Sequence, residues 1–322
     1  MRIALIILLA LLLLYILFIV IPSVLIFNFA FGRKECSIPL SERGDLSGTR
    51  YEPYADELIA ADTYVRSHPM ERVGVTAEDG TRLSGFYLDQ HSDRTMIFVH
   101  GYRGEPVSNF CMQAKHYCEL GWNLLFIIQR AHGESGGKWL GLGVLECRDL
   151  PLWIDLAARR EGVENIVLSG SSMGASTIAY ASDDITEPKV KALVLDCGFI
   201  SPRHQLMHDA RMRHLPGFLI LPVMRAYGRL RIGADIYRRT TDSLKNCRVP
   251  AVFIHGTGDL TVSCEQGLEN YNACASEKLW IPVEGAQHIL ACTVGGKDTE
   301  MKTERFLMQY IKPTPRKERK FT

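Results

Sequence analysis

The sequence predicts an α/β fold with a mostly parallel central sheet flanked by helices. From Val73 onward, short apolar runs alternate with longer stretches of helical spacing. The short runs are almost continuously apolar, which is typical of strands covered by helices on both faces. Glycine-rich or polar segments follow several of these runs, at the sheet edge where ligands gather in parallel sheets. With 322 residues and 47% hydrophobic content, we expect one globular domain after an N-terminal appendage.

The N-terminal appendage is strongly apolar, and residues 3–31 contain no charged side chain. About 20 apolar residues cross the roughly 30 Å hydrocarbon layer of a membrane, whereas the apolar region of a cleaved signal peptide has only about 7–15. We therefore expect a transmembrane anchor over residues 1–31. Pro22 and Ser23 are expected to kink or end the span, which leaves residues 24–31 near the membrane interface.

The residues after the anchor indicate its orientation. A membrane-proximal segment is expected over residues 32–71, and it carries Arg33, Lys34, Arg43 and Arg50. The positive-inside rule then favours a single-pass protein with a cytoplasmic catalytic domain.

Nine cysteines without a CxxC pair do not suggest a disulfide framework. A basic tail at 312–322 either rests on anionic head groups or is a solvated terminus.

The predicted elements begin with a β-hairpin around the turn Asp79-Gly80. Further strands are expected at 95–100, 123–128, 165–169, 191–195, 251–255 and 278–283. Helices are expected at 108–120, 144–160, 172–182 and 264–275.

The connection between the sixth and seventh strands is too long for a simple crossover. We interpret residues 201–246 as a helical cap over the site at this edge of the sheet. Its stretch "LPGFLILPVMRAYGRL" is apolar enough to line an acyl pocket or touch the bilayer, or to bury one face on the core.

A candidate nucleophile lies in the turn after the fifth predicted strand. In "GSSMGAS", only Ser172 has glycine both two residues before and two residues after it, at Gly170 and Gly174. In a nucleophile elbow the serine occupies a strained strand-to-helix turn, so small neighbours are needed where backbones approach closely. The following helix N-terminus favours developing negative charge.

Two other loops supply the partners that such a serine needs. In "IFVHGYRG", the loop after His100 can direct the Tyr102 N–H at the oxyanion that the Met173 N–H would also bind. Asp259 follows the seventh strand, and a carboxylate there can hold an imidazole by its Nδ1–H. His288 follows the last strand and is the expected general base. The chain order Ser172, Asp259, His288 is that of one known class of serine hydrolase.

These residues make the sequence resemble the α/β-hydrolase superfamily over residues 72–311. The segments "QRAHGESGG", "GVLECRDLPLWI", "GSSMGAS" and "LDCGFISP" resemble a group of bacterial membrane-anchored, mostly uncharacterised serine hydrolases. The resemblance implies the α/β-hydrolase fold, with the cap between the sixth and seventh core strands, and a serine esterase, lipase or peptidase-like activity. It also places the triad acid at Asp259. Ile128 departs from the group, which usually has Asp there.

Other clusters are weaker candidates. Asp196 also ends a strand and is an alternative triad acid. His204 and His208 are one helical turn apart, a spacing that can bind metal, but no HExxH motif accompanies them and a solvated cap face explains them. Cys197 has no basic neighbour, so we interpret it as a buried structural thiol. No P-loop or dinucleotide fingerprint occurs, so we expect no cofactor and no metal.

The functional expectation is a serine hydrolase (carboxylesterase or lipase-like) that cleaves an ester or thioester of a small-molecule or lipid acyl substrate. The catalytic residues are Ser172, Asp259 and His288, and the oxyanion hole is formed at Tyr102 and Met173. An acyltransferase or peptidase with the same triad, and a catalytically silent interaction protein, remain open. The net charge of +1 gives no electrostatic reason to expect nucleic acid. The sequence does not determine the oligomeric state.

Overall fold

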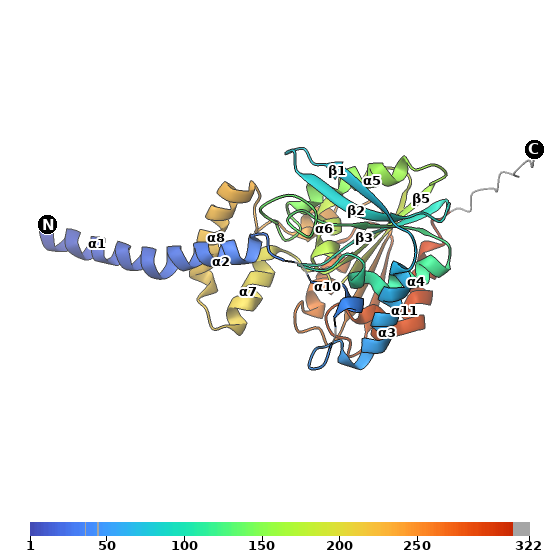
Figure 1. Cartoon of the computed structure of the whole chain (residues 1–322). Helices are drawn as coiled ribbons and strands as arrows, with labels where there is room; N and C mark the ends of the chain where they lie inside the picture. The colour runs from blue at the N-terminus through green and yellow to red at the C-terminus, as the bar shows by residue number, and fades with distance from the viewer. Residues whose placement is uncertain (36, 44, 312–322) are drawn as a thin grey trace, which may run out of the picture.

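The computed structural model describes residues 1–35, 37–43 and 45–311, so the basic tail expected at 312–322 lies outside the described residues. Its centre is an eight-stranded sheet with the order β1-β2-β4-β3-β5-β6-β7-β8 (Figure 1). The strands are β1 Glu71–Thr76, β2 Arg82–Leu88, β3 Arg94–Val99, β4 Asn123–Ile127, β5 Asn165–Ser171, β6 Val190–Asp196, β7 Ala251–Gly256 and β8 Lys278–Val283.

The sheet is parallel from β4 through β8, and the hairpin β1–β2 is added antiparallel at one edge. The hairpin turns where the sequence predicts it, with Gly80 at φ 79° and the Ala77 N–H donating to the Thr81 carbonyl. A positive φ of this kind favours glycine. The prediction of a mostly parallel α/β sheet is therefore confirmed.

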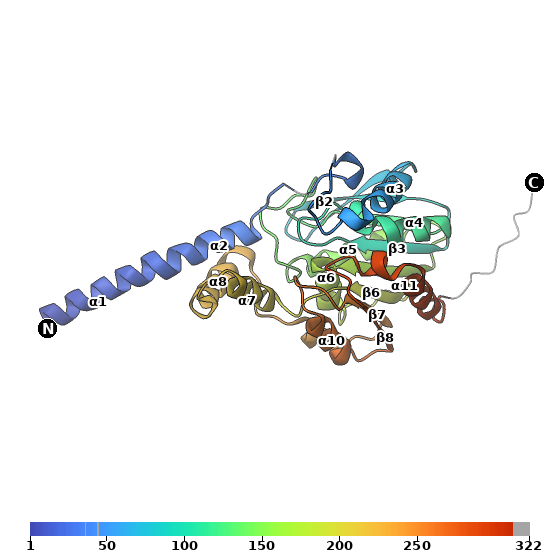
Figure 2. The ribbon, with the colours of Figure 1, turned by 90° about the horizontal axis from the view of Figure 1, so that it is seen from below.

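Helices cover both faces of the sheet because strand side chains alternate between the faces. Ile97 and Val99 of β3 belong to one buried core, whereas Met96 and Phe98 belong to the other. The first core is covered by α5 Leu150–Ala158 and α6 Met173–Ala181, and the second by α4 Cys111–Glu119 and α11 Ala291–Leu307. Helix α10 Cys264–Ala273 follows β7 (Figure 2).

The segment expected to be membrane-proximal packs against the domain. It contains the short helical turns Leu40–Glu42 and Glu52–Tyr54 and the helix α3 Ala55–Arg66. Leu40, Leu46, Leu58 and Ala61 form a buried cluster with Cys111 and Leu290. Residues 40–43 and 45–66 thus pack against the first residue of α4 and the residue that precedes α11.

Three helices lie between β6 and β7: α7 Pro202–Met212, α8 Gly217–Ile232 and α9 Thr240–Leu244. Ser201 begins α7, because its Oγ accepts the His204 N–H. Gly233 ends α8 in the left-handed conformation, at φ 62°. Helices α7 and α8 stand away from the sheet and lie beside the end of the N-terminal helix (Figures 1 and 2).

The N-terminal helix continues through Pro22. It consists of α1 Arg2–Tyr15, a π-helical turn Ile16–Val20 and α2 Ile21–Phe31, and together these form one apolar helix of 30 residues. The helix does not end at Pro22, and a widened turn lies directly before this residue, which has no N–H to donate. The Ser23 hydroxyl donates to the Ile19 carbonyl at 2.6 Å.

The last turns of this helix are part of the protein core. Phe27 and Phe31 are fully buried and their rings stack at 4.3 Å, while the Tyr227 ring of α8 meets Phe27 edge-on at 5.2 Å. Gly228 permits this contact, because a Cβ there would lie 2.9 Å from the Phe27 ring. One side of residues 24–31, expected near the interface, therefore packs on α8 through Phe27.

We expect Phe27→Ala to lower the free energy of unfolding by about 3 kcal/mol, because it empties a filled ring site between α2 and α8. Phe18→Ala is the matched control, since Phe18 lies on the same helix and is 64% exposed. Denaturant unfolding of the full chain in detergent measures both. Equal stability of the two variants would contradict the packing described here.

Candidate active site

Ser172 lies in a strained turn between β5 and α6. It precedes the first residue of α6 with φ 53° and ψ −115°, a region that non-glycine residues rarely adopt. Its glycine neighbours are required by close backbone contacts. A Cβ on Gly174 would lie 1.7 Å from the Val99 carbonyl oxygen, and one on Gly170 would lie 2.6 Å from the Gly174 backbone.

The structure brings together the three residues predicted to react. His288 Nε2 lies 2.9 Å from Ser172 Oγ, and His288 Nδ1 lies 2.6 Å from Asp259 Oδ2. All three side chains are buried. They follow β5, β7 and β8, whose carboxyl ends meet at one edge of the parallel sheet. This chain of hydrogen bonds is the arrangement by which a hydroxyl is activated as a nucleophile.

Asp259 is held as a carboxylate. Its Oδ1 accepts hydrogen bonds from the backbone N–H groups of Thr261 and Val262. Burial opposes its ionisation, but the contacts from His255 and His288 outweigh burial and hold the pKa well below its usual range. His255 Nε2 lies 3.5 Å from the same Oδ2 that binds His288. No sequence motif marks His255 as a partner of this carboxylate.

His288 is poised as a neutral imidazole. Burial lowers its pKa, the hydrogen bond to Asp259 partly offsets this, and the positive charge of Arg50 lowers it further. Arg50 lies close by, with Nη1 3.4 Å from the His288 carbonyl oxygen. With Nδ1–H directed at Asp259, the Nε2 lone pair faces the serine hydroxyl.

The loop after β3 lies against the serine. A Cβ on Gly101 would be 3.4 Å from Ser172 Cβ, and the Gly101 N–H donates to Asn109 Oδ1 at 2.6 Å. Within residues 1–35, 37–43 and 45–311, the N–H groups of Tyr102 and Met173 donate no hydrogen bond to protein. Both amides are thus available to a ligand oxygen. Asn109 is a supporting residue that the sequence analysis missed.

Two buried histidines fix the shape of this loop. His132 Nε2 accepts the Arg103 N–H at 3.0 Å, and His100 Nε2 accepts the Gln129 N–H at 3.0 Å. A nitrogen that accepts must carry no proton, so both rings are neutral. Burial lowers the pKa of His100 to about 3 and that of His132 to about 4, consistent with this role.

The neighbouring segment "QRAHGESGG" supports the same loop through buried groups. Arg130 donates to both carboxylate oxygens of Asp149 and also to Asp79. Ile128, where the resembling group has Asp, is buried, and its carbonyl accepts the Ser135 hydroxyl.

A large cavity of about 980 Å³ opens onto Ser172 and His288. The cap contributes apolar side chains to it, including Ile220, Leu221 and Met224 of α8. These three residues are also buried in the first core, so this stretch both lines the cavity and packs on the core. Further walls come from α2, through Leu25, Ile26, Phe29 and Ala30. The sequence analysis did not assign any part of the N-terminal helix to the site.

The end of α2 is tied directly to the loop after β3. The Tyr102 hydroxyl donates to the Ala30 carbonyl at 2.9 Å, and Arg103 Nη2 donates to the Phe29 carbonyl at 2.6 Å. The Arg103 guanidinium also lies over the Phe29 ring. The carbonyl groups of the last four residues of a helix have no hydrogen-bond partner within that helix. The contacts from Tyr102 and Arg103 supply partners for two of these carbonyls in α2. No sequence motif signals this connection.

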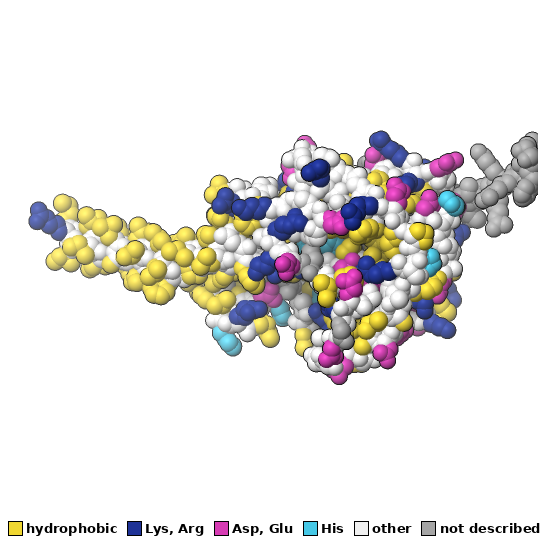
Figure 3. Space-filling model, viewed as in Figure 1, with side chains coloured by type: hydrophobic (Ala, Val, Ile, Leu, Met, Phe, Trp, Pro, Cys, Tyr) yellow, Lys and Arg dark blue, Asp and Glu magenta, His cyan; other side chains and the backbone are white. Residues whose placement is uncertain are grey.

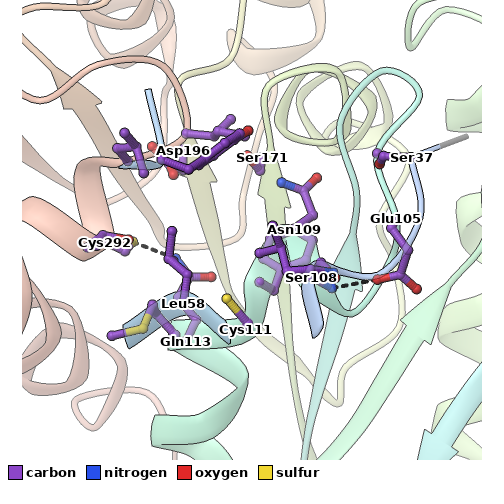
Figure 4. A pocket seen from close by; sticks show the side chains of 18 of the residues that line it. Ser37, Leu58, Glu105, Ser108, Asn109, Cys111, Gln113, Ser171, Asp196 and Cys292 are labelled. Atoms are coloured by element: carbon purple, nitrogen blue, oxygen red, sulfur yellow. Dashed lines mark hydrogen bonds between the residues drawn. The ribbon is translucent and has the colours of Figure 1, made fainter. Parts of the chain in front are cut away.

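A smaller cavity of about 90 Å³ lies beside the site, lined by residues that include Ser171, Asn109, Gln113 and Asp196 (Figure 4). Asp196, the alternative triad acid, is buried there, and its Oδ1 has no hydrogen-bond partner among the described residues. Burial raises its pKa to about 7. A half-protonated carboxyl group without a bond to His288 is poorly suited to stabilise an imidazolium.

The remaining candidates have other partners. His204 Nδ1 lies 2.7 Å from Ser201 Oγ at the start of α7, and His208 Nε2 donates to the Leu260 carbonyl, which fastens α7 to the loop after β7. Cys197 lies close to Asp259 and His288, with their ligand atoms within 4.8 Å of one another. Burial holds the pKa of its thiol far above the usual value, so the sulfur stays protonated. Both nitrogens of His288 already face Asp259 and Ser172.

Known proteins resemble this chain at low sequence identity. No family model matches it. The uncharacterised protein YqkD of Bacillus subtilis is 25% identical over 255 residues, covering 76% of this chain and 82% of YqkD. The uncharacterised protein YfhR of Escherichia coli O157:H7 is 23% identical over 227 residues, covering 68% of this chain and 73% of YfhR.

Solved structures share the architecture. The Pyrococcus furiosus esterase Pf2001 matches with a TM-score of 0.62 at 22% identity, covering 78% of this chain and 93% of that protein. The α/β hydrolase GrgF of Penicillium sp. sh18 matches with a TM-score of 0.58 at 18% identity, over 75% and 99%. An acetyl xylan esterase of Paenibacillus sp. R4 matches with a TM-score of 0.55 at 17% identity, over 84% and 98%. This likeness confirms the predicted fold.

The pH dependence of any reaction at Ser172 follows from the lowered pKa of His288. The base works only when neutral, so kcat/KM for an uncharged substrate falls as pH drops through this pKa. We expect the midpoint of the acidic limb below about 6.5, the ordinary histidine value. Arg50→Gln removes one cause of the lowered pKa and moves the midpoint to higher pH.

The matched control for this pH profile is Arg159→Gln on α5, whose side chain is 78% exposed and paired with Asp155. It leaves the midpoint unchanged. A midpoint well above 6.5 in the unmodified protein, or one that Arg50→Gln does not move, would contradict the electrostatics of the site.

Proposed function

We propose that this chain, which has the α/β-hydrolase fold, is a membrane-anchored serine hydrolase that cleaves carboxylic esters or thioesters through Ser172, His288 and Asp259. The observation that carries the proposal is the continuous chain of hydrogen bonds from Ser172 Oγ through both nitrogens of His288 to Asp259. The strained serine backbone and the free amides beside it support the same reaction.

In the first half of the proposed reaction, His288 Nε2 takes the hydroxyl proton as Ser172 Oγ forms a bond to the substrate carbonyl carbon. Asp259 stabilises the imidazolium that results. The N–H groups of Tyr102 and Met173 donate to the oxyanion, a role supported by their lack of other acceptors. The bond to the leaving oxygen or sulfur then breaks, the leaving group takes the proton from His288, and an acyl-enzyme remains.

In the second half, His288 takes a proton from water while the water oxygen attacks the acyl carbon. The bond to Ser172 Oγ breaks, and the serine regains its proton from His288. The products are the free acid and the regenerated enzyme. Buried His100 and His132 take no part in these transfers, since each is committed to holding the loop after β3.

Membrane anchoring is supported by the length and exposure of the N-terminal helix. Residues Arg2–Phe31 form a helix of 30 residues whose most apolar window is not buried at all within the chain. At 1.5 Å per residue this helix is about 45 Å long, which exceeds the roughly 30 Å hydrocarbon layer. The part of the helix that exceeds this thickness is long enough to include the end of α2, which packs on α8. The basic residues beyond it favour a cytoplasmic catalytic domain.

We expect Ser172→Ala to reduce the hydrolysis of a p-nitrophenyl ester at least about 10³-fold, because it removes the nucleophile and little else. Circular dichroism should show an unchanged fold. A fluorophosphonate probe should label the unmodified protein at Ser172 and leave the variant unlabelled. Retention of most activity, or a protein that the probe does not label, would rule out this nucleophile and favour a silent binding protein.

The two candidate acids are distinguished by matched amide variants. Asp259→Asn should lower kcat about 10³- to 10⁴-fold, since the amide no longer stabilises the imidazolium and disturbs its tautomer. Asp196→Asn should change kcat by less than about tenfold, because Asp196 makes no hydrogen bond to His288 among the described contacts. The reverse pattern in steady-state kinetics would transfer the acid role to Asp196.

A further inference from the structure

The lining of the large cavity has an apolar part and a cationic part, and a simple soluble ester needs neither. One part is apolar and is built by α2 and α8, with Leu25, Phe29, Ile220 and Met224 among its residues. At about 980 Å³, the cavity is at the upper end of the range for small-molecule pockets. An acetyl or other short acyl group would leave most of this apolar wall uncovered. The lining therefore fits a long hydrocarbon chain.

The polar part of the cavity is strongly cationic. Four arginines line it: Arg43, Arg50, Arg103 and Arg213. Within the described residues, none of the four forms an ion pair with a carboxylate, and Asp209 is the one acidic side chain in the lining. Guanidinium groups bind phosphate and carboxylate oxygens in a bidentate manner, and unpaired ones at a cavity wall favour an anionic ligand.

Arg50 brings this positive charge to the reacting atoms. Its Nη1 lies 3.4 Å from the His288 carbonyl oxygen, and its charge is felt at the imidazole. An ester bound with its carbonyl at Ser172 therefore lies in a cavity whose wall carries this cation. Basic side chains also gather where the apolar helix meets the globular part of the molecule (Figure 3).

The cavity reaches the surface on the side from which the N-terminal helix projects. Leu25 and Phe29 of α2, and Leu215 in the turn before α8, line the cavity and are exposed. Helix α8 lies crosswise to α2 in this region (Figures 1 and 2). Beside the opening, Met212 and Phe218 are 71% and 73% exposed and do not line the cavity. These exposed apolar side chains form a rim on α7 and α8, which lie beside the end of the apolar N-terminal helix.

We infer that the substrate is a membrane-resident long-chain acyl ester with an anionic head group, which enters the cavity from the bilayer between α2 and the α7–α8 turn. The inference rests on the proposed hydrolase function and names its substrate class. The acyl chain lies against the apolar walls of α2 and α8. The head group lies toward the arginines and leaves as the alcohol when the ester bond breaks.

The charge preference is tested with the full-length protein in vesicles of non-hydrolysable diether phosphatidylcholine. The guest substrates share one palmitoyl chain: a phosphate ester (lysophosphatidylglycerol), a carboxylate (monopalmitoyl glycerate) and a neutral ester (monopalmitoylglycerol). Fatty-acid release at alkaline pH, on the plateau of the His288 titration, gives kcat/KM. We expect the anionic esters to exceed the neutral one at least about tenfold. The two anionic substrates identify which oxyacid the arginines prefer.

Arg43→Gln and Arg50→Gln should each lower this ratio of anionic to neutral kcat/KM, and Arg50→Lys should restore part of it because it keeps the charge. Arg159→Gln on α5 is the matched control and should leave the ratio unchanged. A ratio near one in the unmodified protein, or a ratio that both glutamine variants preserve, would overturn the anionic assignment.

Access from the bilayer is tested by Phe218→Asp, which places a charge on the exposed rim without altering the cavity lining. It should slow hydrolysis of the vesicle-borne esters at least about tenfold and leave hydrolysis of soluble p-nitrophenyl butyrate unchanged. Leu120→Asp, at an exposed position after α4, is the control and should change neither rate. An unchanged vesicle rate for Phe218→Asp would overturn access through this rim.

These outcomes are separate from failure of the proposed function. If neither p-nitrophenyl butyrate nor any palmitoyl ester is hydrolysed in a manner that depends on Ser172, the hydrolase proposal itself fails. If the soluble ester is hydrolysed but the anionic preference and the rim effect are both missing, only the substrate class is wrong.

Discussion

The hydrogen bond between Asp259 and His288 is the interaction on which the geometry of the site depends. At 2.6 Å between Oδ2 and Nδ1, it sets the tautomer of the ring and directs Nε2 toward Ser172. The carboxylate can make this bond because two backbone amides, from Thr261 and Val262, hold it at the end of β7. The parallel sheet supplies the common edge at which the segments after β5, β7 and β8 meet.

Close packing of the backbone imposes a second constraint. The turn at Ser172 approaches β3 so closely that Gly174 has no room for a Cβ beside the Val99 carbonyl. This contact places the serine next to the loop that begins at Gly101. Neutral His100 and His132 then hold that loop by accepting backbone N–H groups. Their burial lowers their pKa values to about 3 and about 4, which keeps both rings unprotonated at physiological pH.

The N-terminal helix is connected to the same loop. Tyr102 and Arg103 donate to carbonyls at the end of α2, and Phe27 buries the adjacent turn against α8. The helix is therefore both a candidate membrane anchor and a wall of the cavity that opens onto Ser172. A soluble fragment that begins after this helix would lack that wall and two contacts of the loop after β3, which makes the full chain the appropriate material for work on substrates.

The sequence by itself determined the features that depend on local pattern and chain order. Alternating apolar runs predicted the sheet. The sequence also predicted the hairpin, the glycines around Ser172 and the positions of Asp259 and His288 after strands, because each is a property of a short segment. The resemblance to a known family pointed to Asp259 rather than Asp196 as the acid, and the tertiary structure shows Asp259 in contact with His288. Only the tertiary structure decided that α2, Arg43 and Arg50 line the cavity and that Asn109 and His132 hold the loop. These contacts join segments far apart in the chain, and no periodicity or motif in one segment specifies its distant partner.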